Sequence, residues 1–248
     1  MTKHLPKLLW ILAAVGLGLA LLYTTLCHAA VPVTPGPEAD ALAHEVERAV
    51  DADAWARTRT LRWSSGRREH LWDRDRGYAR VRFSGHEVLL DLTRVNGRAW
   101  TGGQEIVESG AQRALLDAAY RWHLNDAYWL NPLVKLFDDG VTRSFGTLGG
   151  ARVLQVAYSS GGVTPGDHYQ WILDANGRPT RWRVWAQVLP VPGMEFTWED
   201  WIRLGTGAWI SRRHEALGIP VVVLTDVVGA ATFAGVEAGE DPFAPIAP

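Results

Sequence analysis

The chain has 248 residues, of which 47% are apolar and 21% charged, and it contains 13 tryptophans but a single cysteine. This composition excludes a disordered chain and a disulfide-stapled scaffold, because a large apolar fraction can form a core and one thiol cannot form an internal disulfide. A formal net charge of -2 excludes the large basic surface that general nucleic-acid binding requires. The composition therefore predicts a packed globular protein that does not bind nucleic acid.

Residues 1–29 have the pattern of an export signal. Lys3 and Lys7 precede an uncharged, apolar run over residues 8–26, and small residues before position 30 fit cleavage after Ala29. The run also approaches the length of a bilayer-spanning helix. Two interpretations stay open: a signal peptide that is removed, or an N-terminal anchor that tethers the protein to the inner membrane. Both place the following chain on the exported, periplasmic side.

Residues 30–37 are predicted to form a proline-containing linker. An amphipathic helix is predicted over residues 37–53. Within that helix Leu42, Val46 and Val50 recur at i, i+4 and i+8. From residue 56 the apolar period changes to two, which is typical of half-buried strands. Short turn signals separate these strands, so the pattern predicts an antiparallel meander.

A helical period returns over residues 109–137, with a break at Asn131-Pro132. Strand patterns resume at residue 141 and continue to residue 228. Because the strands do not alternate with helices, we expect a mainly β (α+β) fold. Its predicted form is a curved antiparallel half-barrel of about eleven strands, over residues 38–228, wrapped around two or three helices. Residues 229–248 lose all periodicity and are predicted to be a loose C-terminal tail.

The sequence lacks the motifs of the common enzyme classes: the nucleophile elbow, the zinc-protease helix, the P-loop and the dinucleotide fingerprint. His123 and Asp126 have the i, i+3 spacing that lets two helical side chains touch, but they lack further metal ligands. We therefore expect no catalytic residue, no metal and no cofactor. The alternative is a small-molecule hydrolase that uses His123 or His168 with nearby carboxylates.

Most of the tryptophans fall on predicted strands and occupy both alternation phases, so both faces of the sheet carry indoles. Rings in phase with apolar neighbours would line the interior of the curved sheet, where large plates suit an apolar ligand. The predicted wall residues are Trp63, Phe83, Trp100, Trp171, Trp182, Phe196 and Trp198. The alternative for each ring is that it only packs the helices against the sheet.

Several local motifs resemble one family of exported proteins. Residues 94–100 are similar to the turn and strand that precede the helical insert in the lipoprotein-localisation superfamily of the LolA and LolB type. Residues 128–141, 164–171 and 177–182 resemble an uncharacterised exported LolA-like relative. The resemblance covers residues 38–228. It implies an unclosed barrel around helices, whose apolar interior holds acyl chains of lipids or lipoproteins in the periplasm.

The predicted function is therefore non-catalytic binding or carrying of a lipid or a lipoprotein acyl chain by a monomer. Binding would come from burial of apolar surface, and rim arginines would select the head group. The candidates for that rim are Arg62, Arg80 and Arg82. If the leader is retained, the same domain becomes a membrane-tethered acceptor or envelope scaffold, associated with the membrane through residues 8–26.

Overall fold

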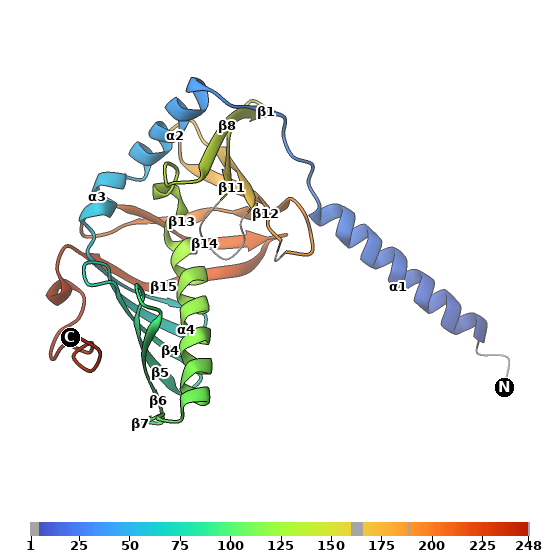
Figure 1. The fold of residues 1–248 in the computed structure, drawn as a ribbon. Helices are drawn as coiled ribbons and strands as arrows, with labels where there is room; N and C mark the ends of the chain where they lie inside the picture. The colour runs from blue at the N-terminus through green and yellow to red at the C-terminus, as the bar shows by residue number, and fades with distance from the viewer. Residues whose placement is uncertain (1–4, 160–165, 188, 248) are drawn as a thin grey trace.

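Two antiparallel sheets curve around a long helix in the computed structural model (Figure 1). The structure describes residues 5–159, 166–187 and 189–247. Lys3, Thr164 and Pro165, which belong to the sequence motifs above, lie outside these residues. The helices are α1 (Leu5–Leu26), α2 (Pro37–Ala49), α3 (Ala52–Arg57), α4 (Ser109–Leu130) and the 3-10 turns η1 (Pro132–Val134) and η2 (Phe233–Gly235).

The strands form one sheet of six and one of nine. In the six-stranded sheet the spatial order is β1 (Val33–Thr34), β8 (Val141–Leu148), β9 (Ala151–Tyr158), β10 (His168–Leu173), β11 (Pro179–Trp185) and β12 (Met194–Thr197). In the nine-stranded sheet it is β13 (Glu199–Arg203), β14 (Trp209–Ala216), β15 (Ile219–Ala230), β2 (Thr60–Ser65), β3 (Arg68–Asp73), β4 (Tyr78–Phe83), β5 (His86–Asp91), β6 (Asn96–Thr101) and β7 (Gln104–Glu105).

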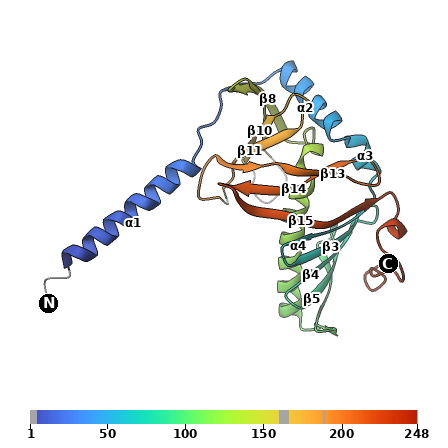
Figure 2. The same ribbon diagram turned by 180° about the vertical axis from the view of Figure 1, so that it is seen from behind.

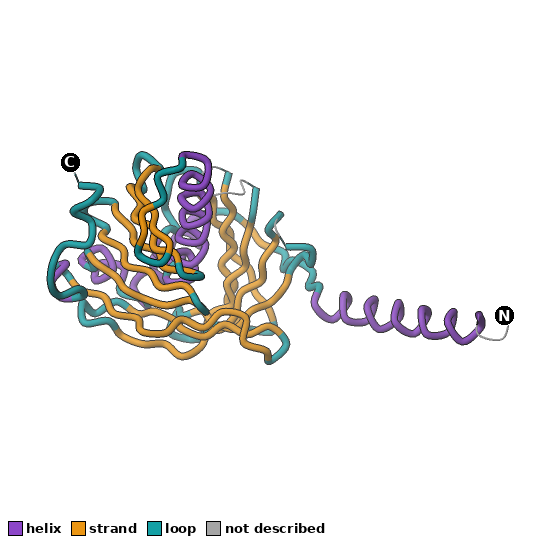
Figure 3. Tube along the Cα trace, turned by 90° about the horizontal axis from the view of Figure 1, so that it is seen from below, coloured by secondary structure: helices purple, strands orange, loops and turns teal. Residues whose placement is uncertain are grey.

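The two sheets meet at Trp198, between β12 and β13. The backbone N–H of Trp198 still donates to Thr180 of the six-stranded sheet, at 2.8 Å. On the other side, the hydroxyl of Thr197 accepts from the backbone N–H of Glu215 in the nine-stranded sheet, at 3.0 Å. The strands therefore form one bent wall that ends at β1 and β7 without closing, which confirms the open half-barrel (Figure 3).

The described residues contain fifteen strands rather than the predicted eleven or so. Two of them, β1 and β7, have only two residues each, too few to show an alternation in the sequence. Residues 194–203 read as one strand, but they split where the chain crosses between the sheets. The first predicted helix is also divided, because Asp51 adopts the left-handed conformation with φ 55° and its side chain caps α3.

Each sheet buries its inner face under a different helix. Leu42 and Val46 of α2 pack on the six-stranded sheet together with η1, in the same core as Trp171. Leu116 and Ala119 of α4 pack on the nine-stranded sheet. Figure 2 shows α4 running along the inside of that sheet and α2 crossing the other end of the body. The helical insert and its break at Pro132 are thus confirmed.

The C-terminal segment is packed rather than loose. β15 continues to Ala230, and the chain beyond it lies against the outer face of the nine-stranded sheet. Phe243 is fully buried there, with its ring centroid 5.6 Å from that of Tyr78. Asp241 forms an ion pair with Arg76 at 2.5 Å. The prediction of a loose tail is wrong because a few well-spaced apolar and acidic side chains fix an otherwise aperiodic segment.

Phe243→Ala is expected to lower the free energy of unfolding by about 3 kcal/mol, because it removes a fully buried aromatic ring. This ring belongs to the tail cluster, which comprises Leu71, Tyr78, Leu89, Val236 and Phe243. Denaturant unfolding followed by circular dichroism measures the loss. The exposed neighbour Glu240 provides the control, since Glu240→Ala should change stability by less than about 0.5 kcal/mol. Equal, small effects of both substitutions would show that the tail does not contribute to the core.

The chain between α1 and α2 is attached to the six-stranded sheet. The ring nitrogen Nδ1 of His28 lies 3.1 Å from the carbonyl oxygen of Gly193, and the side chain of Gln170 exchanges two hydrogen bonds with the backbone of Val31. Val33 of the expected linker pairs with Gly146 in β8. From this attachment α1 projects away from the body (Figure 1). Within the described parts of the chain, no helix combines the length and the apolarity needed to cross a membrane.

Candidate functional site

The interior of the six-stranded sheet is filled by aromatic side chains that we call the aromatic cluster. Strand register aligns three of them, since Trp171 lies opposite Trp182 on β11, and Trp182 lies opposite Phe196 on β12. The last turn of α4 adds two more rings from the other side. The aromatic cluster comprises Tyr128, Trp129, Tyr158, Tyr169, Trp171, Trp182, Phe196 and Trp198.

The rings of the aromatic cluster touch one another. The centroid of the Trp182 ring lies 4.7 Å from Trp171, 5.0 Å from Trp129 and 5.1 Å from Tyr169. These separations are those of packed aromatic pairs. In this conformation the cluster therefore fills its own interior. Two hollows of the surface lie away from it, at the β4–β5 turn and beside Leu204.

The aromatic cluster contains buried hydrogen-bond donors without partners. Among the described residues, nothing accepts from the indole N–H groups of Trp171, Trp182 and Trp198, and Nε2 of the adjacent His214 is also unpaired. A buried polar group that lacks a partner costs about 1–3 kcal/mol. The cluster therefore combines an apolar surface with unused hydrogen-bonding capacity at several points.

Three half-buried tyrosines form the outer margin of the aromatic cluster. The hydroxyl of Tyr128 donates to that of Tyr158 at 3.3 Å, and the ring of Tyr169 lies 5.8 Å from that of Tyr128. Burial raises the pKa of Tyr128 well above 10 and also raises the pKa values of Tyr158 and Tyr169. All three hydroxyls are protonated at neutral pH, and two of them already donate, Tyr128 to Tyr158 and Tyr169 to Asp167.

The structure brings together four of the predicted wall residues, namely Trp171, Trp182, Phe196 and Trp198. Phe83 lies apart from them, half-buried against α4. Trp100 faces the opposite side of the wall and packs on the tail cluster, so its placement as a wall residue was wrong. The reason is the register of β6, in which Ala99 lies opposite Val88 and points inward.

The predicted rim arginines also lie outside the half-barrel. Arg80 donates to Glu237 of the C-terminal tail at 3.0 Å, and Arg62 approaches the same carboxylate at 3.9 Å. Arg82 instead pairs with Glu87 on the neighbouring strand. Because alternate residues of β2 and β4 pack inward, these arginines point outward and bind the tail and the sheet surface rather than a ligand's head group.

Trp63 belongs to a second buried group, which we call the histidine cluster: Trp63, Arg68, His70, His123 and Asp126. Asp126 on α4 is 1% exposed and accepts from Arg68 Nε at 2.6 Å and from His70 Nε2 at 2.9 Å. Burial alone would raise the pKa of Asp126, but the hydrogen bonds from His70, Arg68 and Asn125 hold it below its ordinary value. The cluster thus fastens the C-terminal part of α4 to β3.

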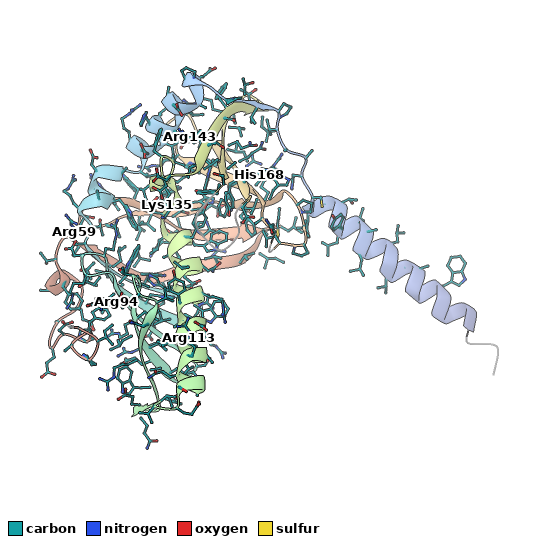
Figure 4. The ribbon with its side chains drawn as sticks, in the orientation of Figure 1. Arg59, Arg94, Arg113, Lys135, Arg143 and His168 are labelled. Atoms are coloured by element: carbon teal, nitrogen blue, oxygen red, sulfur yellow. The ribbon has the colours of Figure 1, made fainter. Side chains whose placement is uncertain are left out.

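Sequence reasoning missed Arg68 and His70, and it paired Asp126 with His123. The carboxylate bonds His70 instead, and burial lowers the pKa of His123 to about 3, so that residue is neutral. His168, the other residue considered for hydrolysis and labelled in Figure 4, stacks on Trp185. The two ring centroids are 4.9 Å apart. Over the described residues, no three His, Cys, Asp or Glu side chains form a group that could hold a metal ion.

The buried His214 predicts a specific pH dependence. Burial lowers its pKa from 6.5 to about 4. The unfolded chain therefore binds a proton here below about pH 6.5, whereas the folded chain does so only near pH 4, so stability is lost as the pH falls through this range. Between pH 6.5 and pH 4, the free energy of unfolding should therefore fall more in the wild type than in His214→Asn, by up to about 3 kcal/mol. Denaturant unfolding at several pH values measures it, and identical pH profiles would contradict the prediction.

No protein-family model matches the chain, and no curated protein matches it either. Two of the solved structures that are similar to it follow. A DUF1329 family protein from Desulfovibrio piger has 13% identity and a TM-score of 0.41, with 80% of this chain and 97% of that chain covered. A putative outer membrane lipoprotein-sorting protein domain from Vibrio parahaemolyticus has 10% identity and a TM-score of 0.30, with 74% and 93% covered.

The second of these structures is of the kind that the sequence motifs resemble. At these identities and TM-scores, neither similarity carries an inference about ligand or activity. Such an inference has to come from the residues of the half-barrel.

Proposed function

We propose that this chain binds an acyl chain of a lipid or lipoprotein in the aromatic cluster, on the exported side of the membrane and without catalysis. The observation that carries the proposal is the set of buried, unpaired indole N–H groups of Trp171, Trp182 and Trp198 within an apolar core. Acyl esters and amides combine a long apolar chain with carbonyl acceptors. Such a ligand would bury apolar surface and supply the missing hydrogen-bond acceptors together.

Entry of a chain requires part of the interior to move, because the rings of the aromatic cluster are in contact. The best candidate is the last turn of α4, which carries Tyr128 and Trp129 and ends at the non-helical Asn131. The side-chain Nδ2 of Asn131 is itself buried without a partner among the described residues. Displacement of this turn would open the tyrosine margin and leave the sheet intact.

Apolar burial would supply the main favourable free energy of this binding. Each buried methylene contributes about 0.8 kcal/mol, so an acyl chain with ten buried methylenes would gain about 8 kcal/mol before the costs of ordering the ligand and moving the helix. Micromolar affinity corresponds to about 8 kcal/mol. Micromolar affinity would therefore need more buried methylenes or the pairing of the indole donors, which would also favour ester- or amide-linked chains over hydrocarbons.

Two other functions remain as alternatives. A membrane-tethered scaffold would use the same fold without a ligand, with its interior permanently filled by α2, α4 and η1. A hydrolase would use the hydrogen-bonded His70–Asp126 pair, but the free nitrogen of His70, Nδ1, is buried without a partner and its ring stacks on Trp63. This arrangement favours a structural role for the pair, so acyl binding is the better-supported function.

Native mass spectrometry of the full chain, released from cell envelopes in mild detergent, tests the proposal. We expect the wild type to carry a lipid mass. Trp182→Phe, which keeps an aromatic ring but removes the indole N–H, should reduce its occupancy. Trp185→Phe is the matched control, because Trp185 lies on the same strand in the opposite phase and stacks on His168. A wild-type protein without bound lipid, which also fails to take up added lipid, would contradict the proposal.

A further inference from the structure

The β14–β15 hairpin exposes a row of aliphatic side chains to water. Ile219, Val221 and Val223 of β15 have exposed fractions of 66%, 52% and 37%, and a bulge interrupts the pairing of this part of β15 with β14. Leu217 in the turn is 55% exposed. The opposite face of β15 is apolar too, since Leu224 packs into the core. A strand with one solvated face normally carries polar residues there, so this hairpin has the composition of an interaction surface.

The tip of the hairpin extends beyond its neighbour in the sheet. β15 pairs with β2 from Leu224 onward, opposite Ser65, whereas the preceding residues pair with β14 alone. Residues 217–224 contain no ionisable side chain. The β15 strand of this two-stranded projection is therefore uncharged, and on β14 the opposing Arg213 and Glu215 pair with each other.

The hairpin points to the side of the body from which α1 departs (Figures 1 and 2). His28, just after α1, contacts the carbonyl of Gly193 immediately before β12. The other end of β12, at Thr197, is bonded to Glu215 at the end of β14. The described side chains of α1 also include exposed aliphatic residues, among them Leu17, Leu19 and Leu21. The two apolar surfaces thus start from the same edge of the half-barrel.

Arginine and tryptophan side chains lie beside the base of the hairpin. Ser65, which pairs with Leu224, ends β2 at the turn that contains Arg67, an exposed residue for which no ion pair is found among the described residues. Arg68 follows, with its guanidinium 4.4 Å from the centroid of the Trp122 ring, and Trp122 is 41% exposed. Aliphatic side chains flanked by arginine and tryptophan match an anionic bilayer surface, where acyl chains meet charged headgroups.

We propose that the β14–β15 hairpin docks on an anionic lipid bilayer, with Leu217, Ile219, Val221 and Val223 at the acyl boundary and with Arg67 and Trp122 at the headgroups. This surface is separate from the aromatic cluster and requires no ligand inside the half-barrel. Docking would hold the half-barrel in one orientation at the membrane, with the attachment point of α1 beside the same surface.

Site-directed spin labelling of the full chain tests this docking. Single cysteines are introduced as Ile219→Cys, Val221→Cys and Val223→Cys in a Cys27→Ser background, and the labelled proteins are mixed with vesicles of phosphatidylethanolamine and phosphatidylglycerol. On vesicle binding, collisions of the label with oxygen should rise severalfold relative to collisions with a water-soluble nickel complex. Val107→Cys is the control, since Val107 is 83% exposed and apolar but lies at the opposite end of the body, beside β7.

Because α1 is present in every variant, the comparison isolates the contribution of the hairpin. Circular dichroism of each labelled protein establishes that the fold is retained. Unchanged accessibility at all three hairpin positions would overturn the proposal. Immobilisation of the labels without a rise in oxygen collisions would also overturn it, because that outcome indicates a contact with protein, such as a second copy of the chain.

Discussion

Asp126→Ala is expected to lower the free energy of unfolding by about 3–5 kcal/mol. The substitution removes a carboxylate that is 1% exposed and leaves the Arg68 guanidinium and the His70 ring without their shared acceptor. Both groups would have to be solvated by water inside the interface between α4 and β3, or remain unpaired. Denaturant unfolding followed by tryptophan fluorescence measures the loss.

Asp117→Ala is the matched control for Asp126→Ala. Asp117 lies on the same helix and pairs at 2.6 Å with Arg113, which is labelled in Figure 4, and their side chains are 38% and 56% exposed. Exposed pairs of this kind contribute about 0–1 kcal/mol, and both substitutions raise helix propensity in the same direction. If the two variants lose the same small amount of stability, the histidine cluster does not fasten α4 to the sheet.

Trp182→Ala should have the second large effect, a loss of about 3–5 kcal/mol. Trp182 is 2% exposed, and its ring packs on several members of the aromatic cluster, the nearest being Trp171 at 4.7 Å. Removing it leaves a cavity among rigid rings that cannot close over the gap. Denaturant unfolding at neutral pH measures the change.

Trp185→Ala provides the comparison for Trp182→Ala. Trp185 is half-buried on the outer phase of the same strand, where it stacks on His168 at 4.9 Å. Its loss should cost about 1 kcal/mol, because solvent can occupy the vacated surface. A similar cost for both substitutions would mean that the aromatic cluster is no better packed than the outer surface.

Local sequence patterns were sufficient to predict the architecture of the half-barrel. The change of period near residue 56, the break at Pro132 and the return of strands at residue 141 all correspond to element boundaries. Trp171, Trp182 and Phe196 could be grouped because each shares an alternation phase with apolar neighbours that face the core. These features depend on residues close together in the chain.

The wrong predictions concern residues whose surroundings are set by contacts between distant parts of the chain. Alternation separates the two faces of β6 but does not say which one α4 covers, so Trp100 was placed inside and the small Ala99 overlooked. The partners of Asp126 come from a strand far away in sequence. Phe243 likewise docks on strands that no local pattern connects with it. Recognition of these sites requires the folded arrangement of helix, sheet and tail.

The most direct test of acyl binding is photo-crosslinking of the full chain with a phospholipid that carries a diazirine near the end of one acyl chain. Mass spectrometry of the digested protein then maps the labelled residues. We predict labels on the last turn of α4 and on β10 and β11, in peptides that contain Tyr128, Tyr169 and Trp182. Labels confined to α1 and the β14–β15 hairpin, with none in the aromatic cluster, would contradict binding inside the half-barrel.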